Sequence, residues 1–410
     1  MNNTPELLSP AGDLDKMRFG IAYGADAVYM AGTRFGMRAA ATNFDDNALR
    51  EGIAYAHAHG VKCYITVNIM PSNRDLPALP AYLELLQDVG ADALIIADVG
   101  VLRMARRYAP RVPVHISTQT SILNHEAANY WADEGAERIV LARELSLEEI
   151  AEIRAKTPKE LEIEAFVHGA MCISYSGRCL ISQYMTGRDA NHGACAQPCR
   201  WNYSLMEEKR PGQFFPVEED GRGTYLYNSK DMCMIEHVPE LIEAGITSFK
   251  IEGRNKTAYY AACVTGAYRA AIDTYKKNPE NFVLPQFCRD EVNKVSHREY
   301  YTGFYFGNQE NGQHYGDSQY IREYEVVGMP VECDDSGKAV FALKNRFFDG
   351  EELELIQPGQ APYVFRAENV TDDEGTKREL FNVPQMRVHF VFPFKVSEWA
   401  ILRKAKERPE

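Results

Sequence analysis

Short apolar runs alternate with amphipathic segments from the start of the chain to about residue 275. Eight of these runs have the length and the β-branched or aromatic content of strands. They lie at residues 6–10, 27–32, 61–69, 93–98, 112–118, 138–143, 160–169 and 247–253. The segments between them, such as 45–60, 79–90, 125–135 and 145–157, repeat apolar residues at helical spacing. Eight strands that alternate with helices predict an α/β fold, a closed (βα)8 TIM-like barrel of parallel strands.

The spacing between predicted strands changes after the seventh strand. The seventh and eighth strands start about 85 residues apart, whereas the earlier strands follow one another much more closely. We therefore expect an insertion at about 170–230. It holds a cysteine-rich loop and then two strand-like runs, 201–206 and 224–229, whose simplest arrangement is a hairpin.

Beyond about residue 285 the pattern changes to short β-like runs separated by Gly, Asp and Pro. Runs of this kind predict a small C-terminal all-β domain, built as a barrel or sandwich. We predict a barrel domain at 1–280, a linker at 281–320 and the C-terminal β-barrel domain at 321–410.

Composition narrows the class of protein. The chain has 410 residues, of which 45% are hydrophobic and 25% charged, so it can bury a core. It shows neither the features of a secretory signal nor a long apolar segment, and we expect a cytoplasmic protein with no membrane association. The formal charge of −13 argues against indiscriminate binding of nucleic acid, although a local basic patch is compatible with it.

Four of the nine cysteines crowd into the insertion as C-x6-C-x15-C-x3-C: Cys172, Cys179, Cys195 and Cys199. Thiols stay reduced in the cytoplasm, so the cluster indicates metal binding or catalysis rather than disulfides. Structural zinc usually takes close pairs, and only Cys195 and Cys199 form one. Iron–sulfur clusters tolerate looser spacing. From spacing alone an iron–sulfur centre is favoured, with zinc or unligated thiols as alternatives.

Barrel enzymes build their sites at the carboxyl ends of the strands, where several polar residues fall in this chain. Glu164 and His168 on the seventh strand are candidate acid/base groups, or supports for the cysteine loop. For His168 a purely structural role is equally compatible with the pattern. The candidate substrate-binding residues are Arg38, Asn68, Gln119, Asn228, Lys230, Lys250, Glu252 and Arg254.

Lys250, Glu252 and Arg254 alternate along the eighth strand and therefore point to one side. If that side is the barrel lumen, the two cations would either pair with Glu252 or hold an anionic ligand such as a dicarboxylate.

The segment EAFVHGAMCISYSGRCLIS (164–182) resembles the signature of the collagenase-like peptidase family, a peptidase U family of unknown catalytic type. Further matches resemble the branch of this family that contains the prephenate-dependent tRNA uridine hydroxylases. They are PELLSPAGDLDKMRFGIAYGADAVY (5–29), VNIMPSN (67–73), ARELSLEEI (142–150), NSKDMCMIEHV (228–238) and KIEGRNKTAYYAACV (250–264). The resemblance covers nearly the whole barrel, but the hairpin after the cysteines is shorter than in some relatives.

The resemblance implies an RNA hydroxylase. It places a [4Fe–4S] cluster on Cys172, Cys179, Cys195 and Cys199, makes tRNA the substrate, with 5-hydroxyuridine formed at the wobble uridine, and makes prephenate a required metabolite. An electron-donor protein is a further possible partner. The alternatives are a collagenase-like protease, hydroxylation of ribosomal RNA cytidine or of a quinone precursor, and a non-catalytic iron–sulfur protein. The sequence has no HExxH or GxSxG motif that would support a protease.

Overall fold

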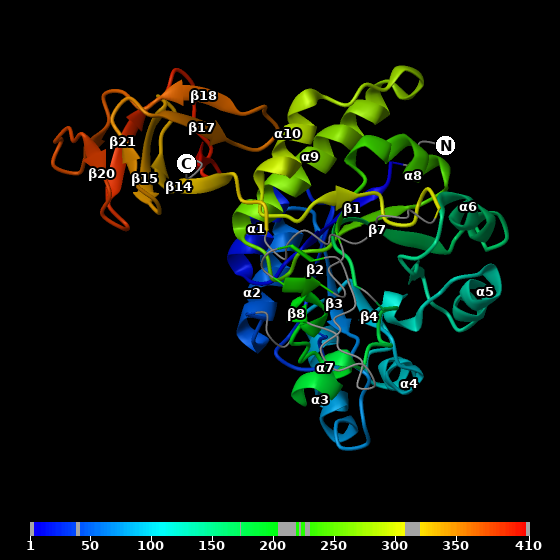
Figure 1. Ribbon diagram of the computed structural model, residues 1–410. Coiled ribbons are helices and arrows are strands. Elements are labelled where there is room, and N and C mark those ends of the chain that lie inside the picture. Colours follow the sequence, from blue (N-terminus) through cyan, green and yellow to red (C-terminus); the bar gives the residue numbers. More distant parts are fainter. Residues whose placement is uncertain are drawn as a thin grey trace, which may run out of the picture.

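A closed barrel and a separate β-sheet domain make up the computed structural model (Figure 1). It describes residues 4–37, 42–172, 174–203, 219–220, 223–225, 230–307 and 320–406. Eight parallel strands of the described chain form the barrel, and pairing of the last strand with both the first and the seventh closes it. These strands are β1 (Glu6–Pro10), β2 (Ala27–Met30), β3 (Lys62–Val67), β4 (Ala93–Ile96), β5 (Val114–Ile116), β6 (Arg138–Val140), β7 (Glu162–Ala170) and β12 (Ser248–Ile251). The predicted (βα)8 barrel is confirmed.

Helices cover the outside of the barrel, as the amphipathic segments predict. They are α1 (Leu14–Ala22), α2 (Asp46–Ala58), α3 (Leu79–Asp88), α4 (Val99–Tyr108), α5 (His125–Asp133), α6 (Leu147–Ala155), α8 (Val238–Glu243) and α9 (Ala258–Lys277). Their starts are encoded locally: Ser146 and Glu149, for example, form a complete capping box at α6. Within the described ranges no helix combines the length and the apolarity needed to cross a membrane.

The insertion after β7 folds over the carboxyl end of the barrel. It contains α7 (Ile181–Thr186), β8 (Asn202–Tyr203), β9 (Glu219–Asp220), β10 (Gly223–Tyr225) and β11 (Asp231–Cys233). β8 and β10 pair antiparallel, as expected for the predicted hairpin, and β11 returns antiparallel along the end of β7. Asn228, together with Arg38 near the second strand, lies outside the described residues.

Part of the segment that we predicted to be a linker, residues 286–301, packs on the barrel domain. Helix α10 (Gln286–Lys294) packs on α9, and β13 (Tyr300–Tyr301) pairs with β11. Cys288, Val292 and Val295 are buried in the same core as the barrel. Apolar positions at helical spacing in 286–294 are the physical reason, because their burial against α9 stabilises this helix.

The C-terminal domain is an antiparallel all-β unit, as predicted. Its main sheet has the order β18-β17-β22-β14-β15-β21-β19, and β16 and β20 form a second small sheet. The strands are β14 (Tyr324–Cys333), β15 (Lys338–Leu343), β16 (Phe347–Phe348), β17 (Glu352–Ile356), β18 (Tyr363–Arg366), β19 (Thr371–Asp372), β20 (Leu380–Phe381), β21 (Arg387–Val391) and β22 (Ile401–Ala405). The domain lies beside α9 and α10 (Figure 1), and Ile356 and Ile401 join the barrel's own core.

Candidate active site at the mouth of the barrel

A cavity of about 180 Å³ opens at the carboxyl ends of the barrel strands, beneath the cysteine loop. Its lining comes from the strand ends and from the insertion: Tyr29, Met37, Thr66, Asn68, Ile95, Ser117, Thr118, Gln119, Arg143, Phe166, Cys172, Ser174, Tyr175, Ser176, Gly177, Cys179, Ala190, Asn191, Cys195, Cys199, Lys250, Glu252 and Arg254. We call it the mouth cavity. A concave site at this end of a barrel is where enzymes of this fold carry their chemistry.

Lys250 enters the mouth cavity from the barrel interior. Its Nζ donates to Glu164 Oε1 over 2.6 Å, and both side chains are almost completely buried. Arg138 Nη1 donates to the other carboxylate oxygen of Glu164 (3.0 Å) and to Glu6 Oε1 (2.6 Å). Burial alone would raise the pKa of Glu164, but Lys250 and Arg138 outweigh it and hold this pKa below its usual value. The result is an ionised buried network under the floor of the cavity.

Two aromatic rings and a second cation complete the floor and one wall. Lys250 Nζ lies 4.6 Å from the centre of the Tyr29 ring and 5.5 Å from that of Phe166. The guanidinium of Arg143 lies 4.4 Å from the Phe166 ring and donates to the carbonyl of Ala170 (2.9 Å). These contacts fix positive charge and flat apolar surface side by side.

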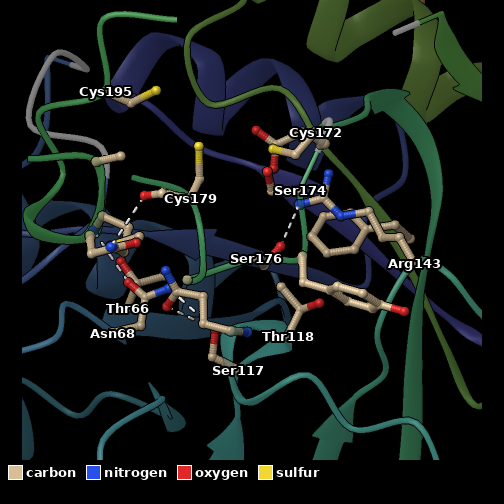
Figure 2. Close-up of a pocket in the computed structure, with 18 of the residues that line it drawn as sticks. Thr66, Asn68, Ser117, Thr118, Arg143, Cys172, Ser174, Ser176, Cys179 and Cys195 are labelled. Atoms are coloured by element: carbon tan, nitrogen blue, oxygen red, sulfur yellow. Dashed lines mark hydrogen bonds between the residues drawn. The ribbon is translucent and has the colours of Figure 1, made fainter. Parts of the chain in front are cut away.

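The cysteine loop is held to the barrel mouth by polar contacts. Arg143 Nη2 donates to Ser176 Oγ (3.4 Å), a contact that is visible in Figure 2, and Met70 N donates to the carbonyl of Asn191 (3.1 Å). Inside the loop, Ser182 Oγ donates to the carbonyl of Arg188 and accepts from Ala196 N. The loop is thus tied both to the barrel and to itself.

The sulfur atoms of Cys172, Cys179 and Cys195 face a common space in Figure 2, and Cys199 lines the same cavity. None of the four forms a disulfide bond, and Gln197 N donates to Cys195 Sγ over 3.4 Å, a contact that tunes sulfur ligands in iron–sulfur proteins. Across the described ranges no three Cys, His, Asp or Glu side chains are close enough to hold one metal ion. A [4Fe–4S] cluster binds one thiolate at each iron, so its ligands are more widely spread than those of a single zinc. Four cysteines that line one cavity are the donor set that such a cluster requires.

The structure brings most of the predicted site residues together. Asn68, Gln119, Lys250, Glu252 and Arg254 all line the mouth cavity with the four cysteines. Asn68 Nδ2 donates to Ser117 Oγ (3.4 Å), and Ser117 Oγ in turn donates to Gln119 Oε1 (3.3 Å), so the two amides belong to one polar strip. Lys250 pairs with Glu164, whereas our sequence-based alternative paired Glu252 with either Lys250 or Arg254.

Of the predicted site residues that the structure describes, Glu164, Lys230 and His168 lie outside the cavity lining. Glu164 sits below it and reaches it only through Lys250. Lys230 makes an ion pair with Glu299 (2.7 Å) at the edge of the barrel.

His168 packs outside the barrel between α9 and β13. Its Nε2 is 3.2 Å from the hydroxyl of Tyr300, and its ring contacts Tyr260 and Tyr268. Burial lowers the pKa of His168 to about 3, so the ring stays neutral near pH 7. This placement favours the structural alternative for His168, and its catalytic role remains a prediction.

Arg143 and Thr66 are among the cavity residues that sequence reasoning missed. Arg143 follows the sixth strand and Thr66 is the penultimate residue of the third, so the rule that selected the other candidates applied to both. Thr66 Oγ1 is buried and has no hydrogen-bond partner among the described residues. A bound molecule in the mouth cavity could satisfy it.

Comparison with known proteins agrees with this architecture. The model of peptidase family U32 matches residues 12–315, and the model of the U32 C-terminal domain matches residues 322–403. The chain belongs to peptidase family U32.

Curated relatives align over most of the chain. A protein of Bacillus subtilis named tRNA hydroxylation protein P1 is 38% identical over 98% of this chain and 95% of its own. The tRNA hydroxylation protein P of Escherichia coli is 37% identical over 90% of each chain. The 23S rRNA 5-hydroxycytidine C2501 synthase of Escherichia coli is 40% identical over 80% of this chain and 48% of its own.

Proposed function

We propose that the protein is an RNA-modifying hydroxylase that converts the wobble uridine of tRNA to 5-hydroxyuridine. The names of the two full-length relatives support tRNA as the substrate class. The single observation that carries the proposal is the mouth cavity, where four cysteines that form no disulfide bond line one space with cations, side-chain amides and aromatic rings. A protease mechanism has no comparable support in these residues.

In this proposal Cys172, Cys179, Cys195 and Cys199 hold a [4Fe–4S] cluster at the roof of the cavity. When bound, the cluster supplies redox chemistry next to the substrate. The chain's own residues orient the base. Asn68 and Gln119 offer amide donors and acceptors to the edge of a pyrimidine, and Tyr29 and Phe166 offer rings for stacking.

Prephenate is the proposed second ligand of the same cavity. It carries two carboxylates, and Lys250, Arg254 and Arg143 are the cations that line the cavity. Arginine binds carboxylates through paired hydrogen bonds, which would fix the orientation of such a molecule. If water supplies the oxygen atom, the replacement of C5–H by C5–OH releases two protons and two electrons. The external redox partner that we propose then accepts these two electrons.

One further substrate has a specific observation behind it. The ribosomal RNA hydroxycytidine synthase matches four fifths of this chain, although the match covers only about half of that protein. Amide side chains can present either donors or acceptors, so Asn68 and Gln119 are compatible with cytidine as well as uridine. Cytidine in ribosomal RNA is therefore the second candidate substrate.

The deciding experiment is mass spectrometry of nucleosides from purified tRNA and ribosomal RNA of a deletion strain. We expect 5-hydroxyuridine and its derivatives to disappear from tRNA and to return with the wild-type gene. Cys172→Ala should fail to restore them, whereas the control Cys333→Ala, in the C-terminal domain, should restore them. Loss of 5-hydroxycytidine from ribosomal RNA instead would favour the second candidate, and no change in either RNA would refute both.

A further inference from the structure

A second cavity lies where the C-terminal domain meets the barrel. Its volume is about 530 Å³, and its lining includes Lys256, Tyr260, Tyr320, Arg322 and Tyr324. We call it the junction groove. Glu252 lines both the junction groove and the mouth cavity, so the two adjoin through one side chain. A molecule that extends out of the mouth cavity past Glu252 therefore enters the junction groove.

Basic and aromatic side chains meet around Tyr320 in this groove. Lys256 Nζ is 4.3 Å from the centre of the Tyr320 ring, and the guanidinium carbon of Arg322 is 5.7 Å from it. Arg298 also lies 5.6 Å from this ring, but it is buried, pairs with Asp231 and does not line the groove. In a chain with a formal charge of −13, such a gathering of cations on one ring is a local exception. Interleaved aromatic and basic groups are the composition of surfaces that bind single-stranded nucleic acid.

The cations deeper in the same junction have a different environment. Arg403 and Lys294 are tied to carboxylates, with Arg403 Nε donating to Glu354 Oε2 (2.8 Å) and Lys294 Nζ to both oxygens of Glu354 (2.9 Å). The partly buried pair of Lys294 on α10 with Glu354 on β17 joins the two domains, and Arg403 on β22 reaches α10 through Glu291. Their charge is neutralised, so they explain docking of the domains but leave the rim of the groove unexplained.

Arg322 belongs to that rim. Its Nε donates to the neutral hydroxyl of Ser296 (3.3 Å), and no carboxylate within the described part of the chain forms an ion pair with it. The residue is exposed, as a contact to a phosphate requires. Lys256 Nζ donates to the carbonyl of Ser296 (2.9 Å), so both cations contact Ser296 and lie near Tyr320.

We propose that the junction groove binds the nucleotide next to the one that occupies the mouth cavity. Its base stacks on Tyr320 or on the guanidinium plane of Arg322, and its phosphate lies against Arg322 and Lys256. This inference rests on the proposed function, because it requires an RNA substrate. It also gives the C-terminal domain a specific task, since Tyr324 and Val326 on β14 contribute to the groove wall.

The test measures RNA affinity of the full-length protein with its cluster in place. A fluorescently labelled, unmodified tRNA transcript is titrated at several salt concentrations against the wild type, Arg322→Gln, Tyr320→Leu and Tyr320→Phe. We expect Tyr320→Leu to raise the Kd roughly tenfold and Tyr320→Phe to keep it near the wild-type value, because stacking needs the ring. We expect Arg322→Gln to raise the Kd and to lower the salt slope by about one.

Arg103→Gln is the matched control, because Arg103 is exposed on α4 and does not line the groove. If Arg322→Gln and Tyr320→Leu bind tRNA like this control while the wild type hydroxylates it, the groove assignment is wrong and the proposed function stands. A raised KM for prephenate with unchanged tRNA affinity would also overturn it, because the groove would then serve the small anion. A wild-type protein that neither binds nor modifies tRNA would overturn the proposed function itself.

Discussion

Lys250 and Glu164 form an ion pair of 2.6 Å in the barrel interior, and less than a tenth of either side chain is exposed. Glu164→Gln would leave Lys250 and Arg138 buried with one carboxylate fewer. We expect the free energy of unfolding to fall by about 3–5 kcal/mol, the usual cost of breaking a buried pair. Urea denaturation measures it.

The double variant Glu164→Gln/Lys250→Met tests whether the two residues act together. It should lose less stability than the sum of the single variants, because neither charge is then left without the other. Glu51→Gln, which breaks an exposed pair with Arg18, should cost less than about 1 kcal/mol. Additive losses would show that the pair contributes nothing as a pair.

His168 should contribute to acid sensitivity, together with His115 and His297, because burial lowers the pKa of all three histidines. The folded pKa of His168, about 3, lies below the ordinary histidine value of about 6.5, so the unfolded chain binds a proton that the folded protein excludes. Stability from this residue is complete above about pH 6.5 and falls by at most about 1.4 kcal/mol per pH unit between that value and about pH 3. His168→Gln should flatten this dependence.

Unfolding free energies at about pH 7 and about pH 5 measure the effect. His59→Gln, at an exposed histidine, should keep the wild-type difference between the two conditions. Glu164 contributes to stability over a different pH range. Its pKa is lowered, so its contribution is present above the ordinary glutamate value of about 4.3 and is lost as the pH falls below it. If the unfolding free energy of His168→Gln changes with pH as much as that of the wild type, the lowered pKa assigned to His168 is wrong.

The cysteines of the mouth cavity should be required for the cluster individually. We expect anaerobically purified wild-type protein to contain about four irons and to absorb near about 400 nm. Cys179→Ala should lose both signals, because a cubane that lacks one thiolate ligand is labile. Cys333→Ala removes a half-buried thiol from the C-terminal domain and should keep both. Stoichiometric zinc in place of iron would refute the cluster.

Arg143 should matter for the position of the cysteine loop. It joins the carbonyl of Ala170 to Ser176 Oγ, and its guanidinium lies over Phe166. Arg143→Lys keeps the charge but loses the planar pair of contacts, so we expect the cluster to be lost faster in air than in the wild type. The half-life of the absorbance near about 400 nm measures this, with Arg103→Lys on α4 as the control. Equal half-lives in Arg143→Lys and the wild type would show that Arg143 does not position the cysteine loop.

Arg403 should couple the two domains. It is fully buried and donates to Glu291 on α10 and to Glu354 on β17. Arg403→Met leaves both carboxylates without it, and we expect a loss of about 3–5 kcal/mol. Calorimetry should then resolve separate transitions for barrel and sheet. Arg378→Gln, in a half-exposed pair with Asp372, should keep a single transition.

The fold was largely predictable from the sequence because each barrel strand is a short buried run between capped helices. The strand predicted at 6–10 has these same bounds in the structure, and the end-of-strand rule placed Asn68, Gln119 and Lys250 at one cavity. The alternation of side chains along a strand did not predict that His168 points away from the barrel interior. The register of β7 and β12 shifts between Lys250 and Ile251, and this bulge turns His168 outward although Phe166 faces the cavity.

The partners of buried ion pairs could not be predicted from the sequence either. Lys250 and Glu164 lie on neighbouring strands but are 86 positions apart in the sequence. The alternation of side chains along one strand gives no information on a neighbour in another strand. Helix α10 was missed because its segment lies between the two strand-rich parts and is short. Its apolar face becomes interpretable only once α9 is present to cover it.

Ile356 and Ile401 of the sheet belong to the same buried core as the barrel, and a shared apolar core opposes movement of the sheet relative to the barrel. A polynucleotide that reaches from the mouth to the sheet meets a fixed template, so the distortion needed to expose a nucleobase must come from the polynucleotide. Selectivity would then favour strands that are already sharply curved before they arrive.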